Sequence, residues 1–317
     1  MAEEKSKNMF DSLRLGAGGG LNSAMEKVAQ ADNAATIAIG IGGTGLSAVR
    51  MFKKTVYERV KQDNFDNRDT ENPIYKRIRF LEIDSDKTDI ESGLLQLDFS
   101  DEIFYIGVSD IIAELTDKAS LKKKKYLNWF NQGVKMTDAT AGAGGIRQIG
   151  KYLLSKRANE LYNKFKDMIT TAVTGLNANF ELNIYIMAGI GGGTGSGCFI
   201  DVCYIMQQAL SDLGYQGSAN ILGFFCLPDV NLSNPNFPKG GPNEVLLKKN
   251  GYAAIKELDY LMNIESNEDE YIQNYTGSFE VHQNTPPVKM CHLLSTTAID
   301  GHILNDGYNY IMNVVAE

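Results

Sequence analysis

The sequence has no excess of basic residues and no long apolar run. Its 317 residues include 31 lysines and arginines against 39 aspartates and glutamates, a net charge of −8 at pH 7. Because nucleic acids and anionic membranes attract an excess of positive charge, this balance argues against general binding to either. No uninterrupted apolar stretch approaches the roughly 20 residues that span a bilayer, and the beginning, Met1–Lys5, lacks the apolar region of a secretory signal. We therefore expect a cytoplasmic protein without membrane insertion, in which any anionic ligand is held locally.

Cysteine and histidine, the usual ligands of soft metals, are also scarce. The four cysteines have no Cys-x-x-Cys spacing, and we expect them to be buried thiols. The three histidines, His282, His292 and His302, fall at intervals of ten residues. This interval suits neither one face of a helix nor a known metal signature, so we do not expect metal ligation by histidine.

Glycine, in contrast, is concentrated in two loops of the kind that bind phosphate. One is Gly40–Gly45, with the sequence Gly-Ile-Gly-Gly-Thr-Gly, and the other is Gly191–Gly197, with the sequence Gly-Gly-Gly-Thr-Gly-Ser-Gly. Each lies where an apolar run changes to a helical pattern. A strand-loop-helix junction of this type directs backbone N–H groups and the positive end of a helix dipole at one point. Two such loops in one chain predict a nucleotide-binding protein.

Strand and helix patterns alternate along the chain. Apolar runs predict strands over residues 35–39, 77–83, 182–188, 220–227 and 288–295. Helical patterns cover residues 46–60, 198–213 and 244–262, a segment ending near 168, and the chain from about 305 onward. With loops gathered at the carboxyl ends of the strands, this alternation predicts a doubly wound, Rossmann-like α/β fold: a parallel sheet with flanking helices.

Three further segments lie near the predicted strand ends or between elements. Asp84-Ser85-Asp86 follows the second strand, where it could orient water around a hard cation, although the same residues suit an ordinary acidic turn. A third glycine cluster, 141–145, precedes Arg147 and could be another backbone cradle or a flexible turn. The proline-rich stretch 231–243 is long for an irregular segment, which favours a lid or a contact loop. The lysine run 122–125, next to aromatic residues, is better explained as a solvated helix face than as a nucleic-acid site.

Three explanations of the glycine loops compete. A nicotinamide or flavin dinucleotide fold would account for Gly40, Gly42 and Gly45, but it needs no second glycine cradle and expects an acidic residue at the end of the next strand about 20 residues on. A P-loop NTPase requires a Gly-Lys-Ser or Gly-Lys-Thr tail that neither loop has. The third explanation is a phosphate site built from several loops without a catalytic lysine.

The third explanation fits a known family. The heptapeptide Gly191–Gly197 resembles the signature loop of the tubulin and FtsZ superfamily, and the other segments follow in the order that the superfamily uses. Gly40–Gly45 is similar to its first phosphate loop, and residues 84–86 are similar to its acidic loop near magnesium. The cluster 141–145 is similar to its loop facing the terminal phosphate. The combination of Gly40–Gly45 with Arg147–Gly150 most resembles the divergent bacterial tubulin-like proteins, whose members are usually much longer than this chain.

The resemblance implies a guanine-nucleotide site for GTP or GDP with Mg²⁺. Asp84 and Asp86 would act on the metal through water, and the loop 228–243 would reach the sugar and a subunit interface. Asn305 or Asn250 would contact the base, with a sugar contact also possible for Asn250, or either asparagine would be only a solvent-facing polar residue. The nucleotide contacts that the resemblance implies are Gly42, Gly43, Thr44, Gly144, Gly145, Gly192, Gly193, Thr194, Gly195, Ser196, Asn250 and Asn305.

The resemblance also implies a domain order and a role. Residues 1–33 would be a flexible extension, 34–302 the GTP-binding domain, and 303–317 the start of a central helix that leads to a second domain absent from this chain. The intact protein would form head-to-tail filaments and act as a cytoskeletal-type GTPase, with a catalytic loop supplied by another chain. No catalytic residue can be named within these residues. The alternative is a nucleotide-responsive scaffold or sensor that binds GTP without significant hydrolysis.

Overall fold

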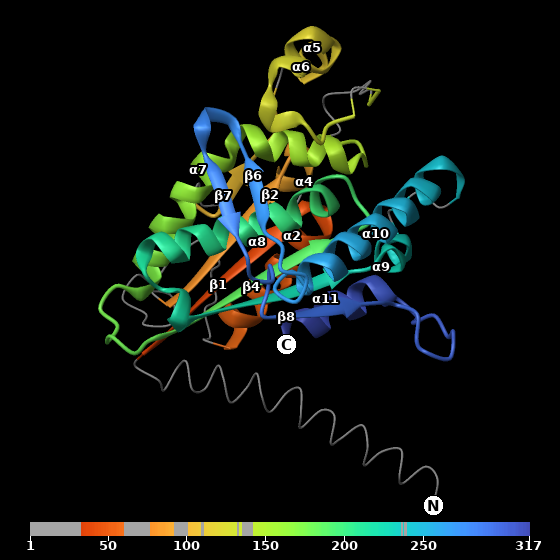
Figure 1. Ribbon diagram of the computed structural model, residues 1–317. Helices are drawn as coiled ribbons and strands as arrows, with labels where there is room; N and C mark the ends of the chain where they lie inside the picture. Colours follow the sequence, from red (N-terminus) through yellow and green to blue (C-terminus); the bar gives the residue numbers. More distant parts are fainter. Residues whose placement is uncertain are drawn as a thin grey trace, which may run out of the picture.

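A single six-stranded parallel sheet forms the centre of the computed structural model (Figure 1). The structure describes residues 33–59, 77–91, 101–108, 111–131, 133–134, 142–235, 237 and 240–317, so nearly all of the predicted extension 1–33 lies outside the described residues. The strand order is β3-β2-β1-β4-β5-β8, and every neighbouring pair is parallel. The strands are β1 Ala34–Ile41, β2 Ile78–Asp84, β3 Ile103–Tyr105, β4 Glu181–Gly189, β5 Ala219–Cys226 and β8 Met290–Leu294. This confirms the predicted α/β class.

Two helices, α7 (Arg147–Val173) and α8 (Thr194–Leu213), cover one face of the sheet. Ile37 and Ile39 of β1 point into this layer, where they join Phe165 of α7 and Phe199 of α8 in one buried core. Every residue of β1 is buried. Such continuous burial is expected for a central parallel strand that has helices on both sides, and it explains the unbroken apolar run in the sequence.

The other face of the sheet packs against α2 (Gly42–Arg59) and α11 (Gly307–Ala316). Ala38 of β1 belongs to this second core together with Phe52 of α2 and Met312 of α11. The side chains of β1 therefore alternate between the two layers, as the period of a strand requires. None of the helices in the described ranges is long and apolar enough to cross a membrane.

The remaining elements are short or lie outside the sheet. They are α4 Lys87–Glu91, α5 Ile111–Thr116, α6 Lys118–Lys123, α9 Pro228–Ser233, α10 Gly241–Met262, the 3₁₀ turns Lys125–Leu127, Gln216–Ser218 and Thr276–Ser278, and the strands β6 Tyr271–Asn274 and β7 Glu280–Gln283. The β6–β7 antiparallel hairpin was not predicted, because four-residue strands carry too short a pattern. Lys122 and Lys123 of α6 are exposed and Phe130 is buried, as expected for a solvated helix face beside an aromatic cluster.

Both glycine loops are tighter than predicted. The first helix begins at Gly42 rather than after Gly45, and α8 begins at Thr194 rather than at Cys198. Most of each predicted loop is therefore the first turn of a helix. The segment 231–243 is also less irregular than predicted, because it contains the end of α9 and the start of α10.

The chain reverses its winding between β1 and β4. From β1 it passes through α2 on one face to β2, whereas from β4 it passes through α8 on the opposite face to β5. The two connections leave the adjacent strands β1 and β4 in opposite directions. In open α/β sheets, this switch point at the carboxyl ends of the strands is where ligands bind.

Candidate functional site

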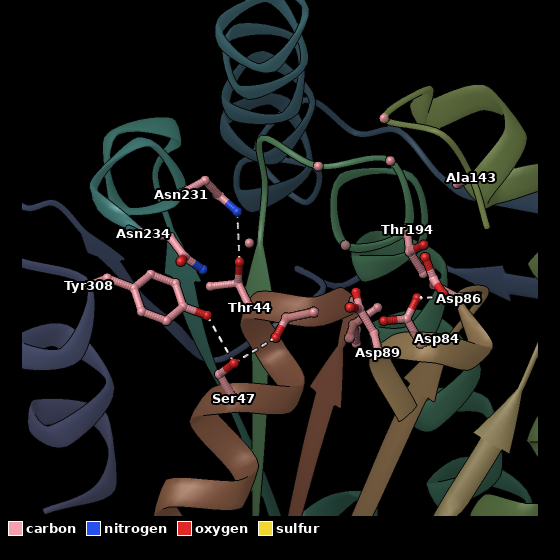
Figure 2. Close-up of a pocket in the computed structure, with 18 of the residues that line it drawn as sticks. Thr44, Ser47, Asp84, Asp86, Asp89, Ala143, Thr194, Asn231, Asn234 and Tyr308 are labelled. Atoms are coloured by element: carbon pink, nitrogen blue, oxygen red, sulfur yellow. Dashed lines mark hydrogen bonds between the residues drawn. The ribbon is translucent and has the colours of Figure 1, made fainter. Parts of the chain in front are cut away.

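A cavity of about 770 Å³ opens at the switch point, beside the carboxyl ends of β1, β2 and β4. Its volume lies in the range of small-molecule sites. Figure 2 shows carboxylates along one side of this cavity and the amide and aromatic groups of Asn231, Asn234 and Tyr308 along the other, with Thr44 between them. The predicted site residues that line it are Gly42, Gly43, Thr44, Asp84, Asp86, Gly144, Gly145, Gly192, Gly193, Thr194 and Gly195.

The two glycine loops touch each other at the base of the cavity. A β-carbon on Gly42 would lie 2.8 Å from the backbone nitrogen of Gly195, and one on Gly195 would lie 2.4 Å from the carbonyl oxygen of Gly189. Gly42 also has a φ of +69°, which side chains of L-residues rarely adopt. Only glycine fits at these positions, and its absence of a side chain brings the first turns of α2 and α8 together.

Both of these helices present positive N-termini to the cavity. Neither α2 nor α8 has an acidic residue in its first turn, and no side chain caps α8 at Gly193. Gly42, Gly43 and Thr194 in these first turns all line the cavity. Backbone N–H groups at a helix start have no partner within the helix, and together with the helix dipole they favour an anion such as phosphate.

Ser85 joins the third glycine loop to the other two. Its hydroxyl accepts a hydrogen bond from the backbone nitrogen of Ala143 at 2.9 Å, and it shares a second hydrogen bond of 2.6 Å with the hydroxyl of Thr194. A β-carbon on Gly142 would lie 2.7 Å from the same hydroxyl. The acidic turn, the 142–145 loop and the start of α8 are thus fixed to one another by one buried serine.

A group of carboxylates faces these loops. Asp84 is buried, and its Oδ1 accepts hydrogen bonds from the backbone nitrogens of Ser85 and Asp86. Burial raises the pKa of Asp84 to about 7, while those backbone N–H groups act in the opposite direction. Asp89 lies so close to Gly43 that a β-carbon there would be 2.8 Å from its Oδ2. Burial, and then the charge of Asp86, raise the pKa of Asp89.

The second carboxylate oxygen of Asp84, Oδ2, is buried and has no hydrogen-bond partner. A buried polar atom without a partner is costly, so this oxygen fits a site that a cation or its bound water completes. Within the described part of the chain, no group of three or more His, Cys, Asp or Glu side chains is placed to hold a metal ion. A hard cation such as Mg²⁺ would therefore depend on water and ligand oxygens as well as on Asp84 and Asp86.

Arg50 of α2 lines the same side of the cavity and is held in place by several contacts. Its guanidinium donates to both carboxylate oxygens of Glu82, at 2.7 and 2.9 Å, and to the backbone carbonyls of Asp89 and Ile90. Glu82 is fully buried, and burial raises its pKa to about 7 even though Arg50 opposes this shift. Arg50 therefore compensates the charge of the buried Glu82 and connects α2 to the backbone of α4.

The far end of the cavity carries neutral polar and aromatic groups. Asn231 of α9 donates from Nδ2 to the hydroxyl of Thr44 at 2.7 Å, and its Oδ1 is buried without a partner. Tyr308 of α11 donates to the hydroxyl of Ser47 at 2.9 Å. Asn234, Asn309 and Met312 complete this end. Amide groups around an aromatic ring and a thioether suit a planar heterocycle with hydrogen-bonding edges.

The structure separates three of the predicted site residues from the cavity. Ser196 turns to the opposite side of α8, where its hydroxyl accepts a hydrogen bond from Nε of Arg147 at the edge of a second cavity of about 530 Å³. Asn250 lies behind the loops, where its amide donates to the carbonyl oxygens of Gly145 and Gly191. Asn305 is exposed, and because α11 begins only at Gly307, the next residues Tyr308 and Asn309 line the cavity instead.

Several cavity residues were not predicted. Ser47 and Arg50 of α2 follow Gly43 at helical spacing, so a helix drawn from Gly42 would have placed them on the same face. Asp89 lies in α4, just after the acidic turn. Its position in sequence was a usable signal, because it follows Asp86 by only three residues. Asn231 and Asn234 fall within the segment already expected to contact a sugar.

Comparisons with known proteins identify a family and several similar structures. A family model described as "Tubulin like" matches residues 37–317. Among solved structures, CetZ2 from Haloferax volcanii, a protofilament bound to GTPγS, is 14% identical with a TM-score of 0.46 and covers 89% of this chain and 56% of its own. TubZ of Bacillus thuringiensis serovar israelensis, a protofilament in its GTPγS form, is 15% identical with a TM-score of 0.45 and covers 90% and 55%. The chain thus spans a little over half the length of these proteins.

No match is found among the curated proteins. The family model, however, covers both glycine loops, the acidic turn, α11 and the sheet, apart from the first three residues of β1, in a single match. These elements also build the cavity. The chain therefore belongs to the tubulin-like family.

Proposed function

We propose that this chain binds GTP or GDP in the switch-point cavity. The phosphates lie against the first turns of α2 and α8 and against Gly144 and Gly145, and the base lies toward Asn231 and Tyr308. The observation that carries the proposal is the contact between Gly42 and Gly195, which brings two helix starts without acidic residues in their first turns to one point facing a cavity of nucleotide size.

Mg²⁺ would be held at the acidic side of this cavity by Asp84 and Asp86 through water, and by phosphate oxygens. Bound there, the metal would neutralise phosphate charge. The chain's own part is electrostatic: backbone N–H groups at Gly43 and Thr194 favour the phosphates, and Asp84 offers an unpaired buried oxygen to the hydrated cation. Ser85 fixes the distance between the acidic turn and the phosphate-binding loops, because it bonds to Thr194 and to the 142–145 loop.

In the intact protein we propose nucleotide-dependent, head-to-tail self-association in the cytoplasm, with hydrolysis coupled to assembly. Membership of the tubulin-like family supports this role. Three carboxylates line the cavity, those of Asp84, Asp86 and Asp89, and none of them is assigned as the catalytic residue. Phosphate release that rises with protein concentration would support an assembling GTPase. Tight binding with negligible release would support the nucleotide-responsive scaffold instead.

Calorimetry with GTP, GDP, ATP and NAD in the presence of magnesium tests the binding site. Gly192 lines the cavity, and a β-carbon there meets nothing within 4 Å, so Gly192→Glu places a carboxylate among the phosphates without a backbone clash. We expect GTP and GDP affinity to fall by about a hundredfold or more, since like charges placed together cost several kcal/mol. Gly217→Glu is the matched control, because Gly217 is exposed, equally open and outside the cavity-lining set.

The control should bind within about twofold of the unmodified chain, because a single surface charge is screened. Equal affinities in the Gly192→Glu variant and in the unmodified chain would refute the location of the site. A preference for NAD over GTP would refute the nucleotide class.

A further inference from the structure

Asn250 connects two loops of the cavity from behind. It lies on α10 with 5% of its surface exposed. Its amide nitrogen donates to the carbonyl oxygens of Gly145 at 2.7 Å and Gly191 at 2.9 Å, with a longer contact of 3.4 Å to Gly192. One side chain therefore satisfies carbonyl groups from both the 142–145 loop and the loop before α8.

The 142–145 loop is fixed at its other end as well. The backbone nitrogen of Ala143 donates to the hydroxyl of Ser85, and a β-carbon on Gly193 would lie 2.9 Å from that of Ala143. Ala143 and Gly145 are thus held at separate points. Gly144 lies between them, has a φ of +56°, lines the cavity, and would have nothing within 4 Å of a β-carbon.

This arrangement has a mechanical consequence. A short peptide that is fixed on both sides and open in the middle presents the Gly144 backbone to the cavity in one position. Without Asn250, the carbonyls of Gly145 and Gly191 would lose their common donor, and buried carbonyl groups without a partner are unfavourable. The two loops would then separate or rearrange to recover hydrogen bonds.

We propose that Asn250 is a positioning residue, which sets the spacing between the 142–145 loop and the Gly191–Gly192 segment so that Gly144 discriminates a nucleoside triphosphate from a diphosphate. The inference rests on the proposed nucleotide site. Asn250 itself does not line the cavity. It acts through the loops. Because the base is placed toward Asn231 and Tyr308, the terminal phosphate lies at the opposite side of the cavity, beside Ser85 and the 142–145 loop that bonds to it.

The test compares Asn250→Ala with Leu258→Ala in the full chain. Leu258 is a buried residue of the same helix, two turns further on, and belongs to the hydrophobic core. Calorimetry measures the dissociation constants of GTPγS and GDP with magnesium. We expect the unmodified chain to prefer GTPγS and Asn250→Ala to reduce that preference by about tenfold, as expected for the loss of one to two hydrogen bonds. Leu258→Ala should leave the preference unchanged, even though it lowers stability.

A second measurement does not depend on nucleotide. Amide hydrogen exchange of residues 142–146 in the nucleotide-free chain should accelerate in Asn250→Ala and stay unchanged in Leu258→Ala. Asn250→Ser, which keeps a single shorter donor, should fall between Asn250→Ala and the unmodified chain in both measurements, and it provides a milder variant if the alanine variant does not fold.

The outcomes separate the two proposals. A chain that binds no nucleotide refutes the proposed function and, with it, the discrimination assigned to Gly144. A chain that binds nucleotide with no preference for GTPγS, or one whose preference survives in Asn250→Ala and Asn250→Ser, overturns the role of Asn250 alone. Equal acceleration of exchange in Leu258→Ala would show a general loosening of α10 and would also overturn it.

Discussion

Gly42 and Gly195 come from different strand-helix junctions and meet at one point, where a β-carbon on Gly42 would lie 2.8 Å from the Gly195 nitrogen. The contact depends on the opposite winding of α2 and α8 about the adjacent strands β1 and β4. It explains why two glycine clusters more than 140 residues apart in sequence form one site. Neither cluster alone encloses a ligand.

Replacing Gly42 by alanine should therefore destabilise the fold. The positive φ alone costs roughly 1–3 kcal/mol for a residue with a side chain, and the close approach to Gly195 adds to that cost. Urea unfolding followed by circular dichroism measures the change. Gly217→Ala is the control, since its β-carbon is unobstructed, and it should leave stability the same or slightly higher. Equal midpoints for Gly42→Ala and the unmodified chain would contradict the contact.

Arg50→Met should destabilise the protein more at pH 8 than at pH 5. Glu82 is buried, and its folded pKa, about 7, lies above the ordinary value of 4.5. The folded state therefore holds a proton that the unfolded state has lost, and stability from this group falls as pH rises between these two values. At pH 8 the variant leaves an ionised, buried Glu82 without Arg50, at a cost of about 3–5 kcal/mol.

The double variant Arg50→Met with Glu82→Gln is the control for this prediction. It removes the charge that Arg50 compensates, so it should recover most of the stability lost at pH 8 and show a weaker pH dependence. Unfolding curves at both pH values provide the measurement. A loss in Arg50→Met that is the same at pH 5 and pH 8 would show that the ion pair with Glu82 is not the cause.

Ser196→Ala should leave nucleotide affinity within about twofold, because the Ser196 hydroxyl bonds to Arg147 and faces away from the cavity. The lost hydrogen bond should cost about 0.5–1.5 kcal/mol of stability. Thr194→Val removes a hydroxyl that lines the cavity and bonds to Ser85, and affinity should fall by about tenfold. Calorimetry with GTP on both variants decides the matter. A larger loss in Ser196→Ala than in Thr194→Val would restore Ser196 as a phosphate contact.

The sequence predicts the part of this site that depends on the backbone. Gly42 and Gly193 line the cavity, as expected for glycine clusters between an apolar strand and a helix in a parallel sheet, and Gly144 of the third cluster lines it as well. The buried strands were predicted for a related reason. A central strand such as β1 is covered on both faces, and its continuous apolar run is unambiguous.

Side-chain direction within the site could not be predicted in the same way. Ser196 and Thr194 are neighbours in one motif, yet a helix begins at Thr194 and turns two successive hydroxyl positions to different cavities. Asn250 was expected at the base or sugar from the family resemblance, but its partners are backbone carbonyls that only the tertiary structure brings together. Because α11 begins two residues later than expected, Asn309 lines the cavity and Asn305 does not.

Asp84→Asn should stabilise the metal-free protein at pH 8 and weaken magnesium-dependent binding. Burial raises the folded pKa of Asp84 to about 7 from 3.8, so its contribution to stability declines as pH rises between these values, and the ionised form is unfavourable at pH 8. Asparagine keeps the oxygen that accepts from Ser85 and Asp86 and removes the charge. We expect a gain on the order of 1–3 kcal/mol in EDTA at pH 8, disappearing below pH 4.

The same variant tests whether Asp84 holds the cation, because its Oδ2 oxygen is the buried atom that a hydrated metal would satisfy. Magnesium should strengthen GTP binding to the unmodified chain by about tenfold more than to Asp84→Asn, since the amide presents a weaker ligand for a hard cation. Asp212→Asn is the matched control, as Asp212 is an exposed carboxylate on the distal end of α8. If both variants kept the full magnesium effect, Asp84 would have no part in holding the cation, and its raised pKa would reflect burial alone.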